Sequence, residues 1–203
     1  MGDMVTTEPD QTILEWVERA KQKDQDAYAE LVYSFQDAVY NLCYRMLGES
    51  GEAEDATQEA FLRAFTHLTR YDVSRSFKTW LLSIASNHCI DRLRKRRLQF
   101  LSLDDEPTAA VLALSSDDPL PEIALQRQER SEYIQALLAD LAPEYRAAVV
   151  LRYWYDYSYI EIAETLETTE SAIKSRLFRA RQMLADKLDA SSGNRHDSLL
   201  EGI

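Results

Sequence analysis

The chain has 203 residues, 45% of them hydrophobic, and its 35 Asp and Glu outnumber its 23 Lys and Arg to give a net charge of -12. Only five Gly, five Pro and two Cys exclude collagen-like, low-complexity and disulfide-scaffold proteins, and no apolar run reaches the roughly 18 residues of a membrane helix. The first twelve residues carry acids instead of a basic start and an apolar block, so we expect no signal peptide, no membrane insertion and a cytoplasmic location.

Apolar residues recur at helical spacing through most of the chain, and no stretch alternates long enough for a convincing strand. The sequence therefore predicts an all-α protein with two small helical domains. The first domain covers residues 10–98, and its helices are expected at about 10–23, 26–47, 50–68 and 77–98. Gly48 suits the left-handed position after the second helix, and Ser76 can cap the fourth helix after a loop over residues 69–76.

Helical periodicity fails between residues 99 and 121, where acidic residues, serines and prolines crowd together. We expect residues 99–121 to form an acidic, flexible linker. The second domain then covers residues 122–189, in which Pro143 suits the first position of a helix. Residues 190–203 are polar and are expected to form a flexible tail.

The end of the second domain has the dimensions of a helix-turn-helix. Ser158 and Glu161 form a capping box that opens a short helix, a turn over residues 167–169 follows, and a longer helix comes last. The polar face of this last helix carries the candidate DNA contacts Ser171, Lys174, Ser175, Arg176, Arg179 and Arg181. Lys and Arg can bind phosphate or the acceptor edge of guanine. The alternative is a solvated basic helix in a bundle, but the capped helix, the short turn and the four cations together favour a DNA reader.

A second basic cluster ends the fourth helix of the first domain. It consists of Arg92, Arg94, Lys95, Arg96 and Arg97. The alternative role for this cluster is a cationic helix end that complements the helix dipole. Two basic stripes on an acidic chain, however, predict two local phosphate contacts. Upstream, Trp80, His88 and the loop over residues 69–76 can offer stacking surfaces and hydrogen bonds to unpaired bases. Phe61 and Phe77 are expected to pack in the core.

The cysteines, histidines and acids form no pattern typical of a metal or catalytic site. Two cysteines and three histidines give no paired CxxC spacing, so we expect no metal, no cofactor, and Cys43 and Cys89 as unbridged core residues. Asp55 and Glu59 lie one helical turn apart and could serve a metal-dependent nuclease, but no third ligand or base is evident. We therefore expect no catalytic residues and no enzyme.

Several segments match a known family in order and spacing. Residues 55–65, 76–87 and 91–97 resemble region 2 of the extracytoplasmic-function (ECF, group 4) sigma factors of the sigma-70 family. Residues 141–146, 159–163 and 173–181 are similar to region 4 of the same factors. The resemblance covers residues 25–188. It implies an alternative sigma factor that binds core RNA polymerase, reads the -10 and -35 promoter elements, directs promoter-specific transcription initiation and aids strand opening.

The resemblance also implies roles for individual residues. The acidic helix that binds the β′ clamp helices of core polymerase corresponds here to Asp55, Gln58 and Glu59. The place where such factors capture a flipped base of the -10 element corresponds to His67, Tyr71, Ile84 and Asn87. The cluster from Arg92 to Arg97 matches the surface that meets phosphates just upstream, and the last helix matches the -35 reader.

Further partners are implied by the same resemblance, namely the β flap of core polymerase, promoter DNA and an anti-sigma protein. The acidic linker is expected to thread toward the RNA exit path of the polymerase. The chain departs from the common pattern at residues 171–173, which read Ser-Ala-Ile instead of Gly-Thr-Val, and at Phe178, where a histidine is frequent. These positions bear on which -35 sequence is preferred.

A stand-alone helix-turn-helix regulator with an N-terminal sensor or dimerisation domain is the main alternative. It accounts for the last third of the chain. It leaves the acidic helix, the loop over residues 69–76 and the Arg92–Arg97 cluster without a function. Tight promoter binding by the protein alone would favour it.

Overall fold

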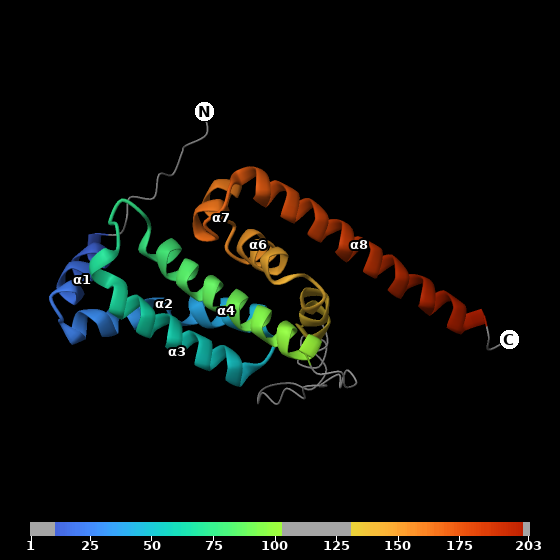
Figure 1. The fold of residues 1–203 in the computed structure, drawn as a ribbon, viewed down its shortest axis with the longest axis horizontal. Coiled ribbons are helices and arrows are strands. Elements are labelled where there is room, and N and C mark those ends of the chain that lie inside the picture. Colours follow the sequence, from blue (N-terminus) through green and yellow to red (C-terminus); the bar gives the residue numbers. More distant parts are fainter. Residues whose placement is uncertain (1–10, 103–130, 201–203) are drawn as a thin grey trace.

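The computed structural model describes the backbone of residues 11–102 and 131–200, and the side chains of residues 11–99 and 131–189. Every regular element in these described ranges is a helix, which confirms the predicted all-α class. The helices form an N-terminal unit and a C-terminal unit that pack against each other (Figure 1). Most of the predicted linker and the predicted start of the second domain at Glu122 lie outside the described residues.

The N-terminal unit is a bundle built around one central helix. Its elements are α1 (Gln11–Lys21), α2 (Gln25–Leu47), α3 (Ser50–His67), the 3₁₀ turn η1 (Leu68–Arg70) and α4 (Phe77–Ser102). Helix α2 packs against α1, α3 and α4. It buries Leu31, Val39 and Leu42 in a core that Leu81 and Leu82 of α4 complete. Each such side chain contributes about 1.5–3 kcal/mol on burial, so this interior is the main stabilising feature of the unit.

Capping residues set the helix ends of this unit. Asp24 caps α2 by accepting hydrogen bonds from two backbone N–H groups. Gly48 ends α2 with a φ of 85°, the left-handed conformation predicted for it. The third helix begins at Ser50, as predicted, and the carboxylate of Glu49 caps it. The loop before α4 is shorter than residues 69–76, since η1 occupies its beginning.

The C-terminal unit contains the predicted helix-turn-helix. Its elements are a helical segment over residues 131–139, α6 (Pro143–Trp154), α7 (Tyr159–Thr165) and α8 (Glu170–Leu200). Pro143 is the first residue of α6, and Ser158 and Glu161 make both hydrogen bonds of the predicted capping box. Helix α8 packs against α6 and α7 and buries Ile173 and Leu177 between them.

Two long helices extend past their predicted ends. Helix α4 continues to Ser102 instead of stopping at residue 98, and α8 continues to Leu200 where the sequence predicts a flexible tail from residue 190. Neither extension contains a proline. A polar sequence indicates that a stretch lies in solvent, but it does not by itself end a helix.

The seam between the two units is formed by α2 and α4 on one side and by α6 and α7 on the other. The guanidinium of Arg146, which is only 7% exposed, donates hydrogen bonds to the carbonyls of Met46 on α2 and of Ala139 in its own unit. Burial and the nearby Arg96 lower the pKa of Arg146 to about 10. The buried cation therefore ties the end of α2 to the C-terminal unit.

Two tyrosines add hydrogen bonds to this seam. The hydroxyl of Tyr155 donates to the carbonyl of Ala38 on α2. The hydroxyl of Tyr157 lies 3.3 Å from the hydroxyl of Thr79 on α4. Burial raises the pKa of both tyrosines, so both stay protonated at neutral pH.

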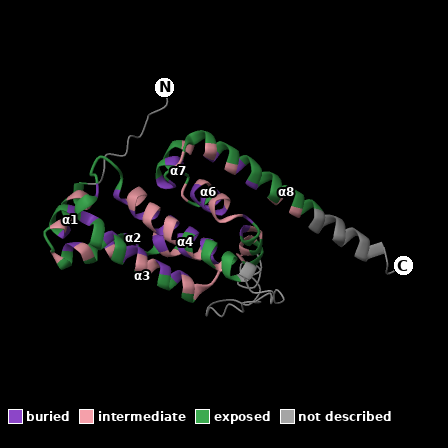
Figure 2. Ribbon diagram, viewed as in Figure 1, coloured by how far each residue is buried: buried purple, intermediate pink, exposed green. Residues whose placement is uncertain are grey.

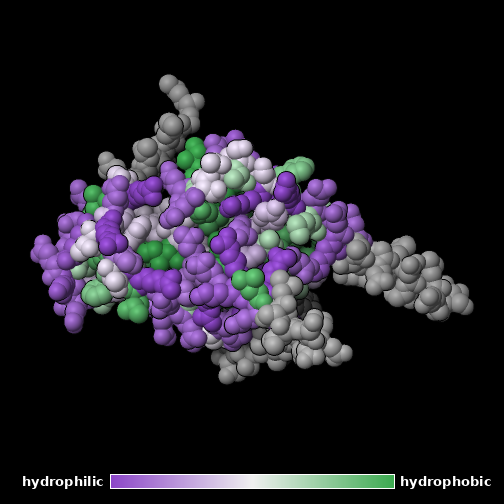
Figure 3. Space-filling model, in the orientation of Figure 1, coloured by the Kyte–Doolittle hydropathy of each residue, from purple (hydrophilic) through white to green (hydrophobic). Residues whose placement is uncertain are grey.

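Buried residues line α2, α3, α4 and α6, whereas much of α8 is exposed (Figure 2). Cys43 and Cys89 are buried and unbridged, as predicted. The face drawn in Figure 3 is mainly hydrophilic with small apolar patches. Among the described helices, none is long and apolar enough to span a bilayer.

Candidate polymerase and nucleic-acid interface

The three acidic-helix residues predicted to bind polymerase lie together on the outer side of α3. Asp55 and Gln58 are exposed and Glu59 is half-buried, and all three line one shallow hollow between α3 and α4. Arg63 donates a 2.7 Å hydrogen bond to Glu59 and lowers the pKa of that carboxyl. Leu62 stands beside them with 61% of its surface exposed. The hollow thus combines negative charge with an apolar contact.

His88 lies on this side of α4, at the edge of the same hollow. We expected it beside the loop as a stacking group for bases, which the structure does not support. Its Nε2 is buried without a hydrogen-bond partner among the described residues. Burial lowers its pKa, and the nearby Arg63 adds to this effect.

The predicted base-capture residues gather around a cavity of about 480 Å³ at the start of α4. His67, Ile84 and Asn87 line it together with Trp80. Within the part of the chain that the structure describes, the Asn87 amide makes no hydrogen bond. An amide that neither caps nor braces its helix is available to a ligand.

Tyr71 is the exception among these predicted residues, because it is not among those that line the cavity. It is only 4% exposed, and its hydroxyl donates a hydrogen bond to the carbonyl of Arg75. Its ring centroid lies 5.0 Å from that of Trp80 and 5.5 Å from that of Phe77. Burial raises its pKa to about 12. Tyr71 therefore packs in the interior and stabilises the loop through its hydrogen bond to Arg75.

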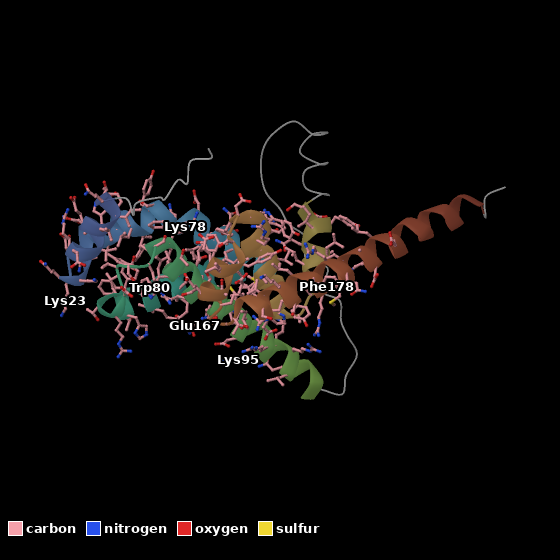
Figure 4. The ribbon with its side chains drawn as sticks, turned by 90° about the horizontal axis from the view of Figure 1, so that it is seen from above. Lys23, Lys78, Trp80, Lys95, Glu167 and Phe178 are labelled. Atoms are coloured by element: carbon pink, nitrogen blue, oxygen red, sulfur yellow. The ribbon has the colours of Figure 1, made fainter. Side chains whose placement is uncertain are left out.

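The predicted basic cluster of α4 is divided between two neighbours instead of forming one free surface. Arg92 and Arg96, one turn apart, both pair with Glu52 at the start of α3. Arg94 points the other way and donates a 2.8 Å hydrogen bond to Glu144 of α6. Lys95 and Arg97 are exposed, and Figure 4 shows Lys95 near the far end of α4. Helical geometry distributes a continuous run of cations around the helix.

The predicted -35 contacts are displayed along the outer face of α8. The exposed positions are Ser171, Lys174, Ser175, Arg179 and Arg181, and Arg176 is half-buried. Lys174 pairs with Glu170 at 2.7 Å. Arg179 donates to the hydroxyl of Tyr145 at 3.3 Å.

Phe178 is part of the same face of α8, although the sequence assigned it no contact. Phe178 is 63% exposed, and Figure 4 shows it on α8. It lines a hollow together with Lys174, Arg179 and Tyr159 of α7. Its spacing of four residues from Lys174 is the signal that places both on one face. A large exposed aromatic side chain among cations is typical of a surface that contacts a partner.

Asp55 and Glu59 gain no third ligand in the structure. No group of three or more His, Cys, Asp or Glu within residues 11–99 and 131–189 is arranged to hold a metal ion. The nuclease hypothesis therefore has no support from this hollow.

Comparison with known families matches both units. Residues 31–99 match Sigma-70 region 2, and residues 131–184 match Sigma-70, region 4. The chain is 40% identical over 176 residues to the ECF RNA polymerase sigma factor SigW of Bacillus subtilis, covering 85% of this chain and 94% of that protein. It is 30% identical over 185 residues to the RNA polymerase sigma-H factor of Pseudomonas aeruginosa, covering 89% of this chain and 94% of that protein.

Two solved structures share the fold. One is CnrH in complex with the cytosolic domain of CnrY, with a TM-score of 0.63, 24% identity, and 89% of this chain and 99% of that chain covered. The other is the sigma factor RpoE in complex with the anti-sigma factor NepR from Bartonella quintana, with a TM-score of 0.62, 20% identity, and 80% and 96% covered. With these matches, the chain belongs to the ECF group of the sigma-70 family and is an alternative sigma factor that directs promoter-specific transcription initiation.

Proposed function

We propose that this sigma factor uses three separate surfaces, for core polymerase, for the -10 element and for the -35 element. It catalyses no reaction of its own and acts in the cytoplasm, where its polymerase is. We assign region 2 to residues 10–98, a linker to residues 99–121, region 4 to residues 122–189 and a tail to residues 190–203.

The -10 assignment rests on one observation above all, the cavity that His67, Ile84, Asn87 and Trp80 line beside the loop. Extruding a base from the duplex costs a few kcal/mol of stacking and pairing. An aromatic face can return about 1–3 kcal/mol by stacking, and an amide without a partner can hydrogen-bond the base edge. Strand opening therefore needs a pocket of this kind and no nucleophile. Arg94, Lys95 and Arg97 are exposed cations, which we assign to the phosphates just upstream.

The -35 assignment is supported by the helix-turn-helix geometry and by the exposed cations of α8. Lys174, Arg179 and Arg181 are exposed on one side of the helix. Exposed ion pairs such as Lys174 with Glu170 are worth only about 0–1 kcal/mol, so phosphate can replace the carboxylate. The apolar ring of Phe178 suits contact with a base methyl group.

The polymerase assignment is supported by the exposed Asp55, the half-buried Glu59 and the exposed apolar Leu62, which line one hollow. We assign them to the β′ clamp helices of core polymerase, and we assign region 4 to the β flap. CnrH is bound by the cytosolic domain of CnrY, and RpoE is bound by the anti-sigma factor NepR. By extension, we propose that an anti-sigma protein also controls this chain.

The deciding experiment is reconstituted transcription. Core polymerase with this protein is tested on a genomic promoter library, and core polymerase alone is the control. We expect a defined set of start sites that share -10 and -35 sequences and that require the added protein. Tight promoter binding by the protein alone, with no stimulation of core polymerase, would instead support the stand-alone regulator.

A further inference from the structure

A hollow of about 580 Å³ lies between α4 and the C-terminal unit. Helix α4 contributes Leu93, Arg96 and Arg97 to its lining, and α6 contributes Arg146. The hollow shares no lining residue with the -10 cavity or with the hollow around Phe178 on α8. Its volume falls within the range of about 300–1,000 Å³ that small-molecule sites occupy. The hollow is therefore large enough for a ligand of nucleotide size.

Arg146 brings a buried cation to this hollow without an acid to balance it. Its side chain is 7% exposed, and its hydrogen bonds go to backbone carbonyls. Within residues 11–99 and 131–189, no carboxylate pairs with it, and its Nε is buried without a hydrogen-bond partner. Burial lowers the pKa of Arg146, and the charge of Arg96 lowers it further. A buried charge is stable when an opposite charge or hydrogen bonds compensate it, so an anion in the hollow would be bound favourably.

Two further guanidinium groups make the hollow positive. Arg96 pairs with Glu52, but a guanidinium has five N–H donors and can bind a second anion as well. Arg97 is exposed and makes no hydrogen bond or ion pair within the part of the chain that the structure describes. Among the described residues that line the hollow, Asp140 is the one acid, and Lys187 already forms an ion pair with it. The lining therefore carries an excess of positive charge.

Apolar side chains complete the lining. Leu93, Leu141, Pro143 and Met183 contribute to it, and Met183 is 43% exposed. Guanidinium groups bind phosphate oxygens in bidentate geometry. An apolar surface that includes an adaptable thioether suits the flat ring of a base. A small dicarboxylate would use only the cations and would leave the apolar surface without a contact.

We propose that this hollow binds a nucleoside diphosphate, with its phosphates against Arg96, Arg97 and Arg146 and its base against Leu141 and Met183. Two phosphate groups offer enough oxygens for three guanidinium groups. The site goes beyond the proposed function, which uses other surfaces except for Arg97, also assigned to promoter phosphates. Because α4 and α6 both line the hollow, the ligand contacts both units and stabilises the free chain.

The first experiment identifies the ligand class. The full-length protein is titrated by calorimetry with ADP, GDP, pyrophosphate and malonate in a magnesium-free buffer. We expect ADP or GDP to bind at a single site and to raise the melting temperature. Pyrophosphate should bind at least about fivefold more weakly, because it lacks the apolar contact of the base. Malonate, a dicarboxylate, should show no saturable binding.

The second experiment locates the site with two matched pairs of variants at exposed positions. Arg97→Gln removes a cation that lines the hollow, and Lys95→Gln removes one of α4 that does not. Met183→Glu adds an acid to the lining, and Gln182→Glu adds one at the neighbouring position. We expect Arg97→Gln and Met183→Glu to weaken nucleotide binding at least about fivefold and each control to weaken it less than about twofold. Arg146 is left in place because its hydrogen bonds hold the seam.

Three results would overturn the proposal. One is the failure of both ADP and GDP to bind. Another is binding of pyrophosphate or malonate as tight as that of the nucleotides, which would mean a site for any small anion. The third is an equal loss of affinity within either pair of variants, which would mean a general effect of charge. All measurements use the free protein, so their outcome is independent of the transcription experiment.

Discussion

The two proposed DNA-reading surfaces differ in where the partners of their cations come from. On α8, Lys174 pairs with Glu170 and Arg179 with Tyr145, all within region 4. On α4, Arg94 pairs with Glu144 across the seam. The cations of the -35 surface therefore find their partners within one region, whereas one cation of the -10 surface pairs with the other region.

Ion pairs alone do not make this difference, since exposed pairs are worth only about 0–1 kcal/mol on either surface. The difference is one of access. DNA can reach Arg179 on α8 without any movement of the regions. Asn87, by contrast, lies in a cavity that Glu164 and Glu167 of region 4 also line.

The largest expected effect comes from the seam itself. Arg146→Leu removes hydrogen bonds to the carbonyls of Met46 and Ala139 and should lower the free energy of unfolding by about 2–4 kcal/mol. Urea unfolding followed by circular dichroism measures this loss. Arg97→Leu, at an exposed position, is the control and should stay within about 0.5 kcal/mol of wild type. Equal stability of both variants would mean that the buried guanidinium does not hold the regions together.

Charge reversal on α3 tests the proposed polymerase-binding surface, on which promoter recognition by both regions depends. Asp55→Lys with Glu59→Lys should weaken core polymerase binding at least tenfold, about 1.4 kcal/mol, with helical content unchanged. The matched reversal of Glu30 and Asp37 on α2 should leave binding near wild type. Titration of labelled protein with core polymerase measures both. Undiminished binding by the α3 variant would remove the polymerase assignment.

The exposed -35 surface is tested by single substitutions on α8. Arg176→Ala and Arg179→Ala should each lower promoter occupancy by the holoenzyme. A base contact should relax selectivity at one position by about 1–3 kcal/mol, whereas a phosphate contact should weaken all sequences alike. Binding to a library of randomised -35 sequences separates the two cases. If neither substitution changes occupancy, α8 is not the reader.

The smallest expected effect is the contribution of His88 to the pH dependence of the free energy of unfolding. Burial lowers its pKa in the folded protein below the ordinary value of about 6.5, so the unfolded chain binds this proton more tightly. Above about pH 6.5, His88 is neutral in both the folded and the unfolded chain, so it does not reduce the free energy of unfolding. As the pH drops through that value, the unfolded chain takes up the proton first, and the free energy of unfolding falls. His88→Gln should therefore lose less stability than wild type between about pH 8 and about pH 5.5 in urea unfolding. Equal losses would show that His88 is solvated.

Much of the fold follows from local rules that the sequence displays. The capping box at Ser158, the left-handed Gly48 and the helical start at Pro143 are all present as predicted, because each depends on a few adjacent residues. The ends of α4 and α8 were predicted too early, since polar composition describes solvent exposure and not helix termination.

The sequence predicted which residues belong to the candidate site better than it predicted where each of them lies in the fold. His67, Ile84 and Asn87 do meet at one cavity, but Tyr71 lies beneath the loop because aromatic packing with Phe77 and Trp80 buries it. Contacts between the two regions, such as Arg94 with Glu144, join residues far apart in the chain. No local pattern in the sequence specifies such a pair.

The most direct test of the central claim is strand opening by Asn87→Ala in the holoenzyme, on a paired promoter and on one whose -10 region is already mismatched. The claim is that α4 and its loop hold an extruded base. The account predicts a loss of about 1–3 kcal/mol in open-complex formation on the paired template, with near-complete rescue on the mismatched one and no change in melting temperature. An equal loss on both templates, together with a lower melting temperature, would contradict it and leave Asn87 as a structural residue of α4.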